Sequence, residues 1–274
     1  MSARLRGIAR ETEEIVAAGW YRTPGGEVRI AELVARAVEG TALHGPDPVP
    51  ATPDTGRATR VEVTGESSTE AARRLTAAAP GDPVAVLNFA SARNPGGGYL
   101  NGAQAQEEAL CRASALYATL LRAPGYYDHH RADRDPFYTD RVIHSPDVPV
   151  FRDDRGRLLD RPYTVGFLTS PAPNAGVIRA RTPERAARIP GALASRAERV
   201  LETAVAHGYR RLVLGAWGCG VFRNDPADVA GAFRALLTGE GRFAGHFDEV
   251  VFAVLDRTRE ERTLTAFRTV FAAA

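Results

Sequence analysis

The chain has 274 residues, of which 44% are hydrophobic and 25% are charged, the composition of a globular protein long enough to bury a full core. A formal net charge of only +2 argues against a general DNA-binding protein, and the 35 basic residues are all arginine, which excludes chemistry that depends on lysine. Two cysteines, Cys111 and Cys219, exclude a disulfide scaffold and a cysteine-rich zinc site.

Apolar residues recur at helical or strand spacing along the chain, and turn residues separate these segments. Helices are expected over residues 6–18, 29–39, 68–79, 104–121, 182–207, 226–237 and 259–271. Strands are expected over residues 60–64, 83–89, 142–144, 148–151, 164–169, 211–215 and 249–255. Turns or loops are expected over residues 24–26, 41–56, 123–140 and 153–156.

This alternation of strands and helices predicts an α/β fold in which helices cover both faces of one sheet. The strands near residues 84–88, 211–215 and 250–255 are apolar throughout, as central strands are. We assign residues 1–56 to a helical N-terminal extension and residues 57–274 to a catalytic domain. The first residues lack the apolar run of a signal peptide and no segment is apolar for long enough to span a bilayer, so a cytoplasmic location is expected.

The most informative stretch lies between residues 94 and 108, after the apolar strand at 83–89. It combines a run of glycines with a polar triplet that opens a helix: Gly96, Gly97 and Gly98, then Gln106, Glu107 and Glu108. Glycines let backbone N–H groups approach a ligand closely, and a helix N-terminus adds donors suited to an anion. Two carboxylates beside such a loop indicate chemistry on a phosphorylated sugar.

A second glycine-rich block follows the strand at 211–215 and runs Gly215, Ala216, Trp217, Gly218, Cys219, Gly220, Val221 and Phe222. The N–H groups around Gly218–Gly220 are expected to form a concavity for an anion. A plain strand-to-helix connection that needs glycine for positive φ is the alternative for such a cluster. We expect Phe222 to contact the ligand. Neighbouring N–H donors could lower the pKa of Cys219, but a nucleophilic role is not favoured, because phosphate binding explains the loop. Trp217 directly follows the strand, so a place in the core is favoured over a stacking role.

Three glycines, seven residues and then Gln-Glu-Glu resemble the signature of poly(ADP-ribose) glycohydrolases, and the run from Asn88 to Pro95 resembles the bacterial form of that family. The second block resembles the family's diphosphate-binding loop. The resemblance implies a macrodomain fold, a mixed β-sheet between helices. It also implies hydrolysis of the ribose–ribose O-glycosidic bond of poly(ADP-ribose), mainly from the chain end, with release of ADP-ribose and without metal or organic cofactor.

The resemblance also implies roles for individual residues. Glu108 matches the catalytic acid that protonates the departing ribose oxygen, and Glu107 matches the residue that orients the reacting ribose. Ser91 and Asn94 are both candidates for holding that ribose, and Asn88 stands where related eukaryotic enzymes carry an acidic residue. The other substrate contacts implied are Gln106, the glycines Gly96 to Gly98, and the segment from Ala216 to Phe222, including Trp217, Gly218, Cys219, Gly220 and Val221.

The implied substrates are poly(ADP-ribose) or ADP-ribosylated proteins. The protein is expected to be a monomer that binds no membrane and no specific nucleic-acid sequence. Two other functions stay open: hydrolysis of mono-ADP-ribose from protein or nucleic acid, and ADP-ribose binding without catalysis, against which the glutamate pair argues. Adjacent His129 and His130 lack a recognised metal-ligand spacing, so an exposed loop is preferred there. The aromatic residues at Tyr126, Tyr127, Phe137 and Tyr138 fit either the border of an adenine site or the edge of the core.

Overall fold

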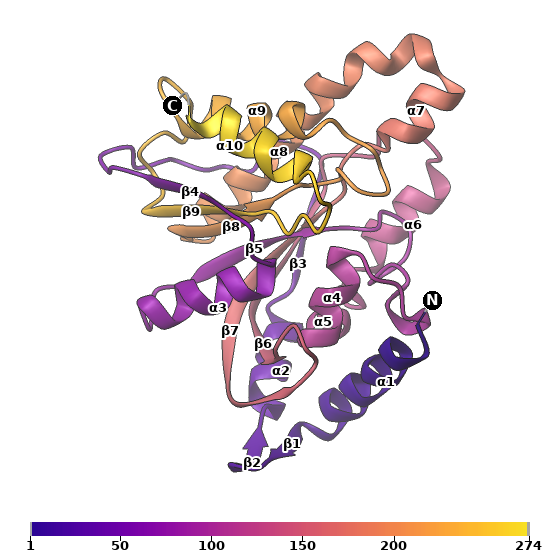
Figure 1. Cartoon of the computed structure of the whole chain (residues 1–274), viewed down its shortest axis with the longest axis vertical. Coiled ribbons are helices and arrows are strands. Elements are labelled where there is room, and N and C mark those ends of the chain that lie inside the picture. Colours follow the sequence, from indigo (N-terminus) through magenta and orange to yellow (C-terminus); the bar gives the residue numbers. More distant parts are fainter. Residues whose placement is uncertain (1, 273–274) are drawn as a thin grey trace.

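The computed structural model describes residues 2–272. A seven-stranded mixed β-sheet lies between two layers of helices (Figure 1). Its strands, in spatial order, are β3 (Ala42–His44), β6 (Val142–Arg152), β7 (Leu158–Ser170), β5 (Val84–Phe89), β8 (Arg211–Gly215), β9 (Glu249–Ala253) and β4 (Arg60–Thr64). The last five are parallel, and β6 is antiparallel to both β7 and β3. This confirms the predicted α/β fold with a mixed sheet.

Each face of the sheet has its own apolar core. The first helix layer, on the lower and right-hand side of the sheet in Figure 1, contains α1 (Ala3–Ala18), α2 (Ala31–Glu39), α3 (Ser68–Ala78), α4 (Gln106–Ala113), α5 (Leu116–Leu120) and α6 (Pro124–Ala132). The second contains α7 (Ala175–Arg181), α8 (Ile189–Ala206), α9 (Pro226–Leu237) and α10 (Arg262–Ala272). On β5, Val86 joins the first core while Ala85 and Leu87 join the second. Burial on both faces explains why the central strands are apolar throughout.

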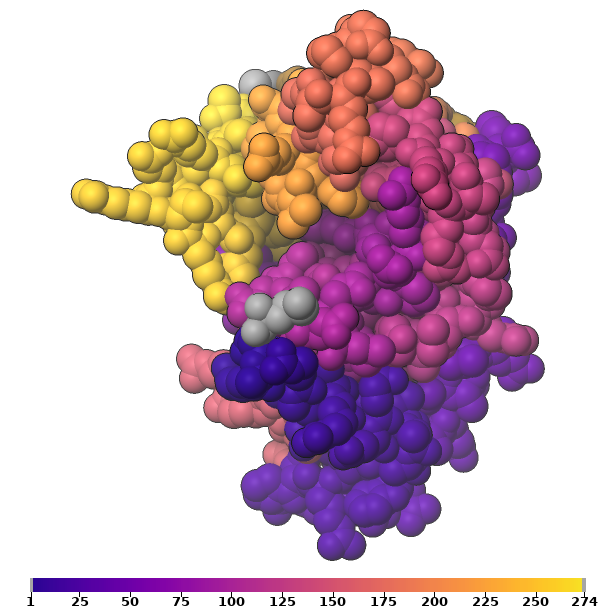
Figure 2. Space-filling view, turned by 90° about the vertical axis from the view of Figure 1, so that its right-hand side faces the viewer, coloured from indigo at the N-terminus to yellow at the C-terminus, as the bar shows by residue number. Residues whose placement is uncertain are grey.

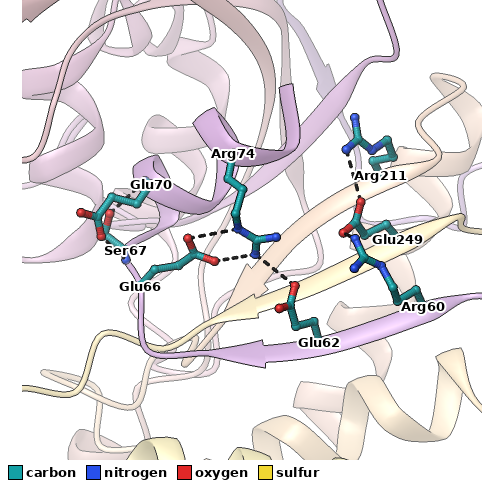
Figure 3. Close-up of polar contacts among 8 residues, drawn as sticks. All are labelled: Arg60, Glu62, Glu66, Ser67, Glu70, Arg74, Arg211 and Glu249. Atoms are coloured by element: carbon teal, nitrogen blue, oxygen red, sulfur yellow. Dashed lines mark hydrogen bonds and ion pairs between the residues drawn. The ribbon is translucent and has the colours of Figure 1, made fainter. Parts of the chain in front are cut away.

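Polar contacts join the first residues of three neighbouring strands. Arg60, Glu249 and Arg211 begin three neighbouring strands, β4, β9 and β8, and lie opposite one another in the sheet register. The carboxylate of Glu249 pairs with both arginines, and its Oε2 lies 3.2 Å from Arg211 Nη2 (Figure 3). Glu249 and Arg211 are buried, so this pairing opposes a shift in register between the strands.

Capping residues define two helix starts near the sheet. Ser67, rather than the expected Ser68, caps α3: its hydroxyl accepts from the N–H of Glu70 at 3.1 Å, and the Glu70 carboxylate accepts from the N–H of Ser67 at 3.2 Å (Figure 3). On the same helix, Arg74 pairs with Glu62 and Glu66 at 3.0 and 2.6 Å. At α9, Asp225 and Pro226 are the cap and first helical residue, as predicted.

The single helix predicted over residues 104–121 is two helices, α4 and α5, in the structure. Ser114 is extended, forms a β-bridge with Val150, and separates α4 from α5. The N–H of Ala115 donates to Pro149 O at 3.1 Å, so the chain hydrogen-bonds across to β6 instead of continuing the helix. This contact is between segments distant in sequence, which local periodicity does not report.

Other boundaries also differ from the sequence-based expectation. The expected loop at 123–140 contains α6, whose first residue, Pro124, suits a first helical turn. The strands expected at 142–144 and 148–151 are one strand, β6, with an irregularity between Ser145 and Val148. The helix expected from residue 182 is a 3-10 segment, Pro183–Arg188, followed by α8. An additional hairpin, β1 (Trp20–Thr23) and β2 (Gly26–Arg29), closes at the turn predicted near residue 25.

The N-terminal segment is tied closely to the rest of the chain. Strand β3, inside residues 1–56, pairs with β6 in the main sheet, and the hydroxyl of Thr12 on α1 donates to Arg112 O at 2.9 Å. The division into an extension and a catalytic domain at residues 56 and 57 stays a prediction. Among the described residues, no helix is both long and apolar enough to cross a membrane.

Candidate active site

The carboxyl ends of the parallel strands open on a cleft of about 1410 Å³. Both glycine-rich loops reach it, because one follows β5 and the other follows β8 at the same edge of the sheet. Figure 2 shows a hollow between the magenta surface near residue 100 and the orange and yellow surface of the C-terminal part. The tertiary structure therefore brings together the two motifs that the sequence separates.

Glu107 is buried at the floor of this cleft, with 2% of its surface exposed. Its Oε2 accepts a hydrogen bond from the N–H of Ser91 at 2.7 Å, and its Oε1 accepts one from Asn88 Nδ2 at 3.2 Å. Burial raises the pKa of Glu107 to about 8, although these hydrogen bonds act in the opposite direction. Burial therefore favours the neutral form of Glu107 relative to an ordinary glutamate.

Glu108 lies beside it and is held by the other end of the same loop. Its Oε1 accepts from the N–H of Gly98 at 2.8 Å. Its Oε2 is buried and has no hydrogen-bond partner within residues 2–272. A buried carboxyl oxygen without a partner is costly, so its presence calls for an explanation such as a catalytic role. Glu108, which lines the cleft, thus has one carboxyl oxygen without a partner in the protein.

The three glycines are explained mainly by these carboxyl groups. A Cβ on Gly97, which has φ of +57°, would lie 2.6 Å from Glu108 Oε1 and 3.3 Å from Glu107 Oε2. A Cβ on Gly96, with φ of +64°, would lie 2.9 Å from the ring of Tyr117. Gly97 and Gly98 also line the cleft, whereas Gly96 is buried behind it. The loop therefore lets its backbone pack against the two glutamates without steric conflict.

The side chain of Gln106 was expected to contact the ligand, but its amide is hydrogen-bonded to other protein groups. Its Oε1 accepts from the N–H of Phe89 at 2.9 Å, and its Nε2 donates to Leu87 O at 2.8 Å and Ser68 Oγ at 3.1 Å. The amide lines the cleft, but both of its N–H groups are already used. Gln106 links the start of α4 to the end of β5 and so positions the two glutamates that follow it.

The candidates for holding the ribose fall into two groups. Asn88 is fully buried, does not line the cleft, and donates to Glu107 and to Thr169 Oγ1 at 3.1 Å, so it acts on the site through Glu107. Ser91 and Asn94 both line the cleft. Ser91 Oγ accepts from the N–H of Asn94 at 3.3 Å, while the exposed Asn94 amide forms no hydrogen bond in the described part of the chain.

The second loop has free backbone donors beside the cleft. In the described residues, the N–H groups of Gly218, Gly220, Val221 and Phe222 donate no hydrogen bond, and these residues line the cleft with Ala216 and Cys219. Gly218 has φ of +70°, and a Cβ there would lie 2.4 Å from Ala172 Cβ. Val221 is 82% exposed. A run of unused N–H groups is the arrangement that binds a diphosphate.

The structure confirms the core position favoured for Trp217 and contradicts a lowered pKa for Cys219. The side chain of Trp217 is in the core, where its Nε1 donates to Ser170 O at 3.0 Å, and it does not line the cleft. Trp217 was included among the substrate contacts, but its position after β8 directs it inward against α9. Burial raises the pKa of Cys219 to about 12, the opposite of the lowering expected from neighbouring N–H groups.

The aromatic and histidine residues after α5 belong mostly to the core. Tyr126 and Tyr127 are buried, and His130 on α6 bonds through Nε2 to Thr139 Oγ1 at 2.8 Å. Burial lowers the pKa of His130 to about 4. No group of histidine, cysteine or acidic side chains among the described residues is arranged to hold a metal ion.

Several residues that line the cleft belong to none of the motifs recognised in the sequence. These are Arg4, Leu5 and Ile8 of α1, the turn at Asp153–Gly156 between β6 and β7, and Leu255–Arg257 after β9. Arg4 Nη2 donates to Arg155 O at 3.0 Å, which joins α1 to the β6–β7 turn. No local motif marks these residues, because they reach the cleft only through the packing of distant segments.

Comparison with known proteins agrees with this geometry. A family described as microbial-type PARG, catalytic domain, matches residues 9–153, just over half of the chain. The crystal structure of poly(ADP-ribose) glycohydrolase from Thermomonospora curvata is similar over 98% of this chain and 100% of that chain, with 53% identity and a TM-score of 0.92. A structure of the same enzyme bound to the inhibitor ADP-HPD has 53% identity and a TM-score of 0.90, over 98% and 99% of the two chains.

A more distant relative has the same fold. Poly(ADP-ribose) glycohydrolase from Deinococcus radiodurans, in complex with ADP-ribose, is 47% identical with a TM-score of 0.83, over 92% of this chain and 99% of that chain. A search of curated protein sequences gave no match. The family match, the identity and the near-complete coverage agree with the two motifs and the shared cleft. This chain therefore belongs to the microbial-type poly(ADP-ribose) glycohydrolase family.

Proposed function

We infer that this chain is a poly(ADP-ribose) glycohydrolase, a glycosidase that hydrolyses the ribose–ribose O-glycosidic bond of poly(ADP-ribose) and releases ADP-ribose. The family match supports this activity, as do similar structures named for it, one with ADP-ribose and one with an inhibitor. The observation that carries the assignment to a site is the unpaired Oε2 of Glu108, a residue that lines the same cleft as the free N–H groups of the second loop.

Glu108 is the proposed general acid. It donates a proton to the departing ribose oxygen as the bond to the anomeric carbon breaks, and the bonding electron pair leaves with that oxygen. An oxocarbenium ion remains on the reacting ribose. The Glu108 carboxylate then takes a proton from water as the water oxygen bonds to the anomeric carbon, which restores the acid. The negative charge of the diphosphate, bound at residues 218–222, lies near this cation and stabilises it.

Glu107 is proposed to hold the reacting ribose. Because burial favours the neutral form of Glu107, two charges on the adjacent carboxyl groups are disfavoured. Asn94 is the better candidate for a second ribose contact, since its side-chain amide lines the cleft and Ser91 already bonds within the loop. The steps use carboxyl groups, backbone donors and water.

Action mainly from the chain end is a further part of this proposal. It is supported by the family resemblance and by the contact between Arg4 and Arg155, which joins two walls of the cleft. Early reaction products should then be free ADP-ribose, whereas cleavage within the polymer would first give oligomers. We also propose that the protein acts as a monomer in the cytoplasm.

The decisive experiment measures ADP-ribose released from automodified poly(ADP-ribose) chains by the native protein and by Glu108→Gln. Glu240→Gln is the matched control, because this exposed glutamate lies outside the cleft. Loss of release by at least ~100-fold in Glu108→Gln alone, with ADP-ribose binding retained, is expected for a general acid.

Two other results would change the assignment. No release by the native protein, with tight binding of ADP-ribose, would make it a reader or a hydrolase of another linkage. Equal release by the native protein and Glu108→Gln would place the chemistry on a different residue.

A further inference from the structure

Arg112 is a buried arginine at the end of α4 that the proposed hydrolysis does not use. Only 9% of its surface is exposed, and it lines the cleft together with Glu108. In the described part of the chain, its guanidinium forms one hydrogen bond and no ion pair. A buried charge without an ionic partner is costly, so the presence of Arg112 calls for an explanation.

Arg112 and Glu108 hold the two ends of one short segment. Arg112 lies four residues after Glu108, so the two residues are on the same side of the helix. Arg112 Nη1 donates to Ala103 O at 2.6 Å, whereas Glu108 Oε1 accepts from the N–H of Gly98 at 2.8 Å. The segment from Gly98 to Ala103 is therefore fixed to α4 at both ends, by one hydrogen bond at each.

The two ends of this segment also contact each other directly. The N–H of Ala103 donates to Gly98 O at 3.1 Å. A Cβ on Gly98 would lie 2.7 Å from Ala103 Cβ, so a glycine is needed for this close approach. A displacement of Ala103 would therefore reach Gly98, whose N–H holds the carboxyl group of Glu108. Three hydrogen bonds in series thus connect Arg112 to the proposed acid.

The middle of the segment is held independently by the N-terminal part of the chain. The hydroxyl of Tyr99 donates to Glu13 Oε1 on α1 at 2.8 Å. The N–H of Ser2 donates to Gly102 O at 3.2 Å, and a Cβ on Gly102 would lie 2.5 Å from Ser2 O. Because these contacts do not involve Arg112, loss of its side chain should loosen the end of the segment without unfolding the whole of it.

The charge of Arg112 acts on the same carboxyl group. Burial lowers the pKa of the Arg112 guanidinium, and the nearby carboxyl group of Glu108 acts in the opposite direction. The cation is thus close enough to interact with Glu108 although the two side chains form no direct ion pair. A cation in this position stabilises the carboxylate that remains after Glu108 has donated its proton.

We propose that Arg112 is a positioning residue for Glu108. It holds Ala103, and through Ala103 and Gly98 it keeps the carboxyl group of Glu108 in the place from which the proton is donated. This inference rests on the proposed function. Because Arg112 acts through Glu108, its loss should reduce turnover and not the binding of ADP-ribose. A guanidinium that bound a phosphate oxygen of the substrate would instead change that affinity.

The test compares Arg112→Gln and Arg112→Lys with Arg141→Gln. Arg141 is the matched control, because it is a half-buried arginine outside the cleft whose guanidinium also makes one hydrogen bond, to Thr139 Oγ1 at 3.1 Å, and no ion pair among the described residues. On poly(ADP-ribose), kcat should fall about 10- to 30-fold in Arg112→Gln, as expected when a catalytic group is slightly displaced.

The other quantities separate positioning from binding. In Arg112→Gln, KM for the polymer and Kd for ADP-ribose, measured by calorimetry, should stay within about twofold of the native values, because the ligand contacts remain. Arg112→Lys keeps a positive charge and a donor, so its kcat should lie between those of Arg112→Gln and the native protein. Arg141→Gln should match the native protein in all three quantities.

Added guanidinium gives a readout that a role in folding alone would not move. Guanidinium chloride at about 50 mM should raise the kcat of Arg112→Ala at least ~3-fold, because the free cation can donate to Ala103 O in place of the missing side chain. Sodium chloride at the same concentration should not do so. Neither salt should raise the kcat of Arg141→Ala.

Three results would overturn the inference while leaving the hydrolase assignment intact. The first is an unchanged kcat in Arg112→Gln. The second is a raised Kd for ADP-ribose, since Arg112 would then bind the ligand itself. The third is an equal loss of kcat in Arg112→Gln and Arg112→Lys without rescue of Arg112→Ala by guanidinium, since Arg112 would then act on folding alone. No release of ADP-ribose by the native protein would refute the proposed function and this inference together.

Discussion

Glu107 and Glu108 are neighbours on α4, yet both carboxyl groups lie against Gly97. The N–H of Ser91 binds Glu107 from one end of the loop, and the N–H of Gly98 binds Glu108 from the other end. Successive residues on a helix point about 100° apart, so helix geometry alone would direct the two side chains away from each other. The loop after β5 instead folds over the helix start and contacts both of them.

Gly97→Ala should therefore abolish activity without unfolding the protein. The added methyl would lie 2.6 Å from Glu108 Oε1 and displace the proposed acid. We expect kcat/KM to fall by at least ~100-fold, the scale of losing a general acid. Backbone strain at positive φ should lower the free energy of unfolding by about 1–2 kcal/mol.

Gly239→Ala is the matched control for this change. Gly239 has φ of +59°, close to the +57° of Gly97, but nothing lies within 4 Å of an added Cβ. It should share the loss of stability, seen in urea unfolding, and keep its activity. Similar activity losses in both variants would show that strain alone, rather than contact with Glu108, is responsible.

The stability of the protein should depend on pH through Glu107. Its pKa in the folded chain, about 8, lies above the ordinary value of 4.5, so between these pH values the folded state holds a proton that the unfolded state has released. The resulting stabilisation is complete below about pH 4.5 and is lost as the pH rises through about 8. The contribution falls by up to about 1.4 kcal/mol per pH unit in this window.

Urea unfolding between pH 5.5 and 8.5 measures this effect when the native protein is compared with Glu107→Gln. The amide does not ionise, so the native protein should lose more stability than the variant as the pH rises. Glu240→Gln, at an exposed position, should follow the native curve. Parallel curves for the native protein and Glu107→Gln would mean that Glu107 is ionised across this range.

Substitution of Ser91 and Asn94 should distinguish their roles. Asn94→Ala removes an amide that lines the cleft and is free of other hydrogen bonds among the described residues, and we expect kcat/KM to fall about 10- to 100-fold. Ser91→Ala keeps the backbone N–H that holds Glu107, so its effect should stay below about fivefold. Steady-state kinetics on poly(ADP-ribose) measures kcat/KM for both variants. A larger loss in Ser91→Ala than in Asn94→Ala would assign the ribose contact to Ser91.

Cys219 should be chemically inert although it lines the cleft. Burial raises the pKa of this thiol to about 12, so little thiolate is present at pH 7.5. Cys219→Ala should keep activity within about threefold, and iodoacetamide at pH 7.5 should not inactivate the native protein within an hour. Rapid inactivation that Cys219→Ala prevents would contradict this account.

The sequence by itself determined the elements whose signals are local. Strands β4 and β8 were predicted with their observed ends, and Asp225 with Pro226 marked the start of α9. These segments follow from periodicity and capping, which depend on neighbours within a few residues. The two glycine-rich loops were also recognisable, because their residue order alone resembles the family, and the strands before them predicted a shared edge of the sheet.

Only the tertiary structure decided how those residues are used. The break between α4 and α5 comes from a bridge between Ser114 and Val150, and Gln106 is engaged with the end of β5. The inward direction of Trp217 and the burial of Cys219 depend on packing against distant helices. Such contacts set burial, hydrogen-bond partners and pKa, and no local pattern in the sequence encodes them.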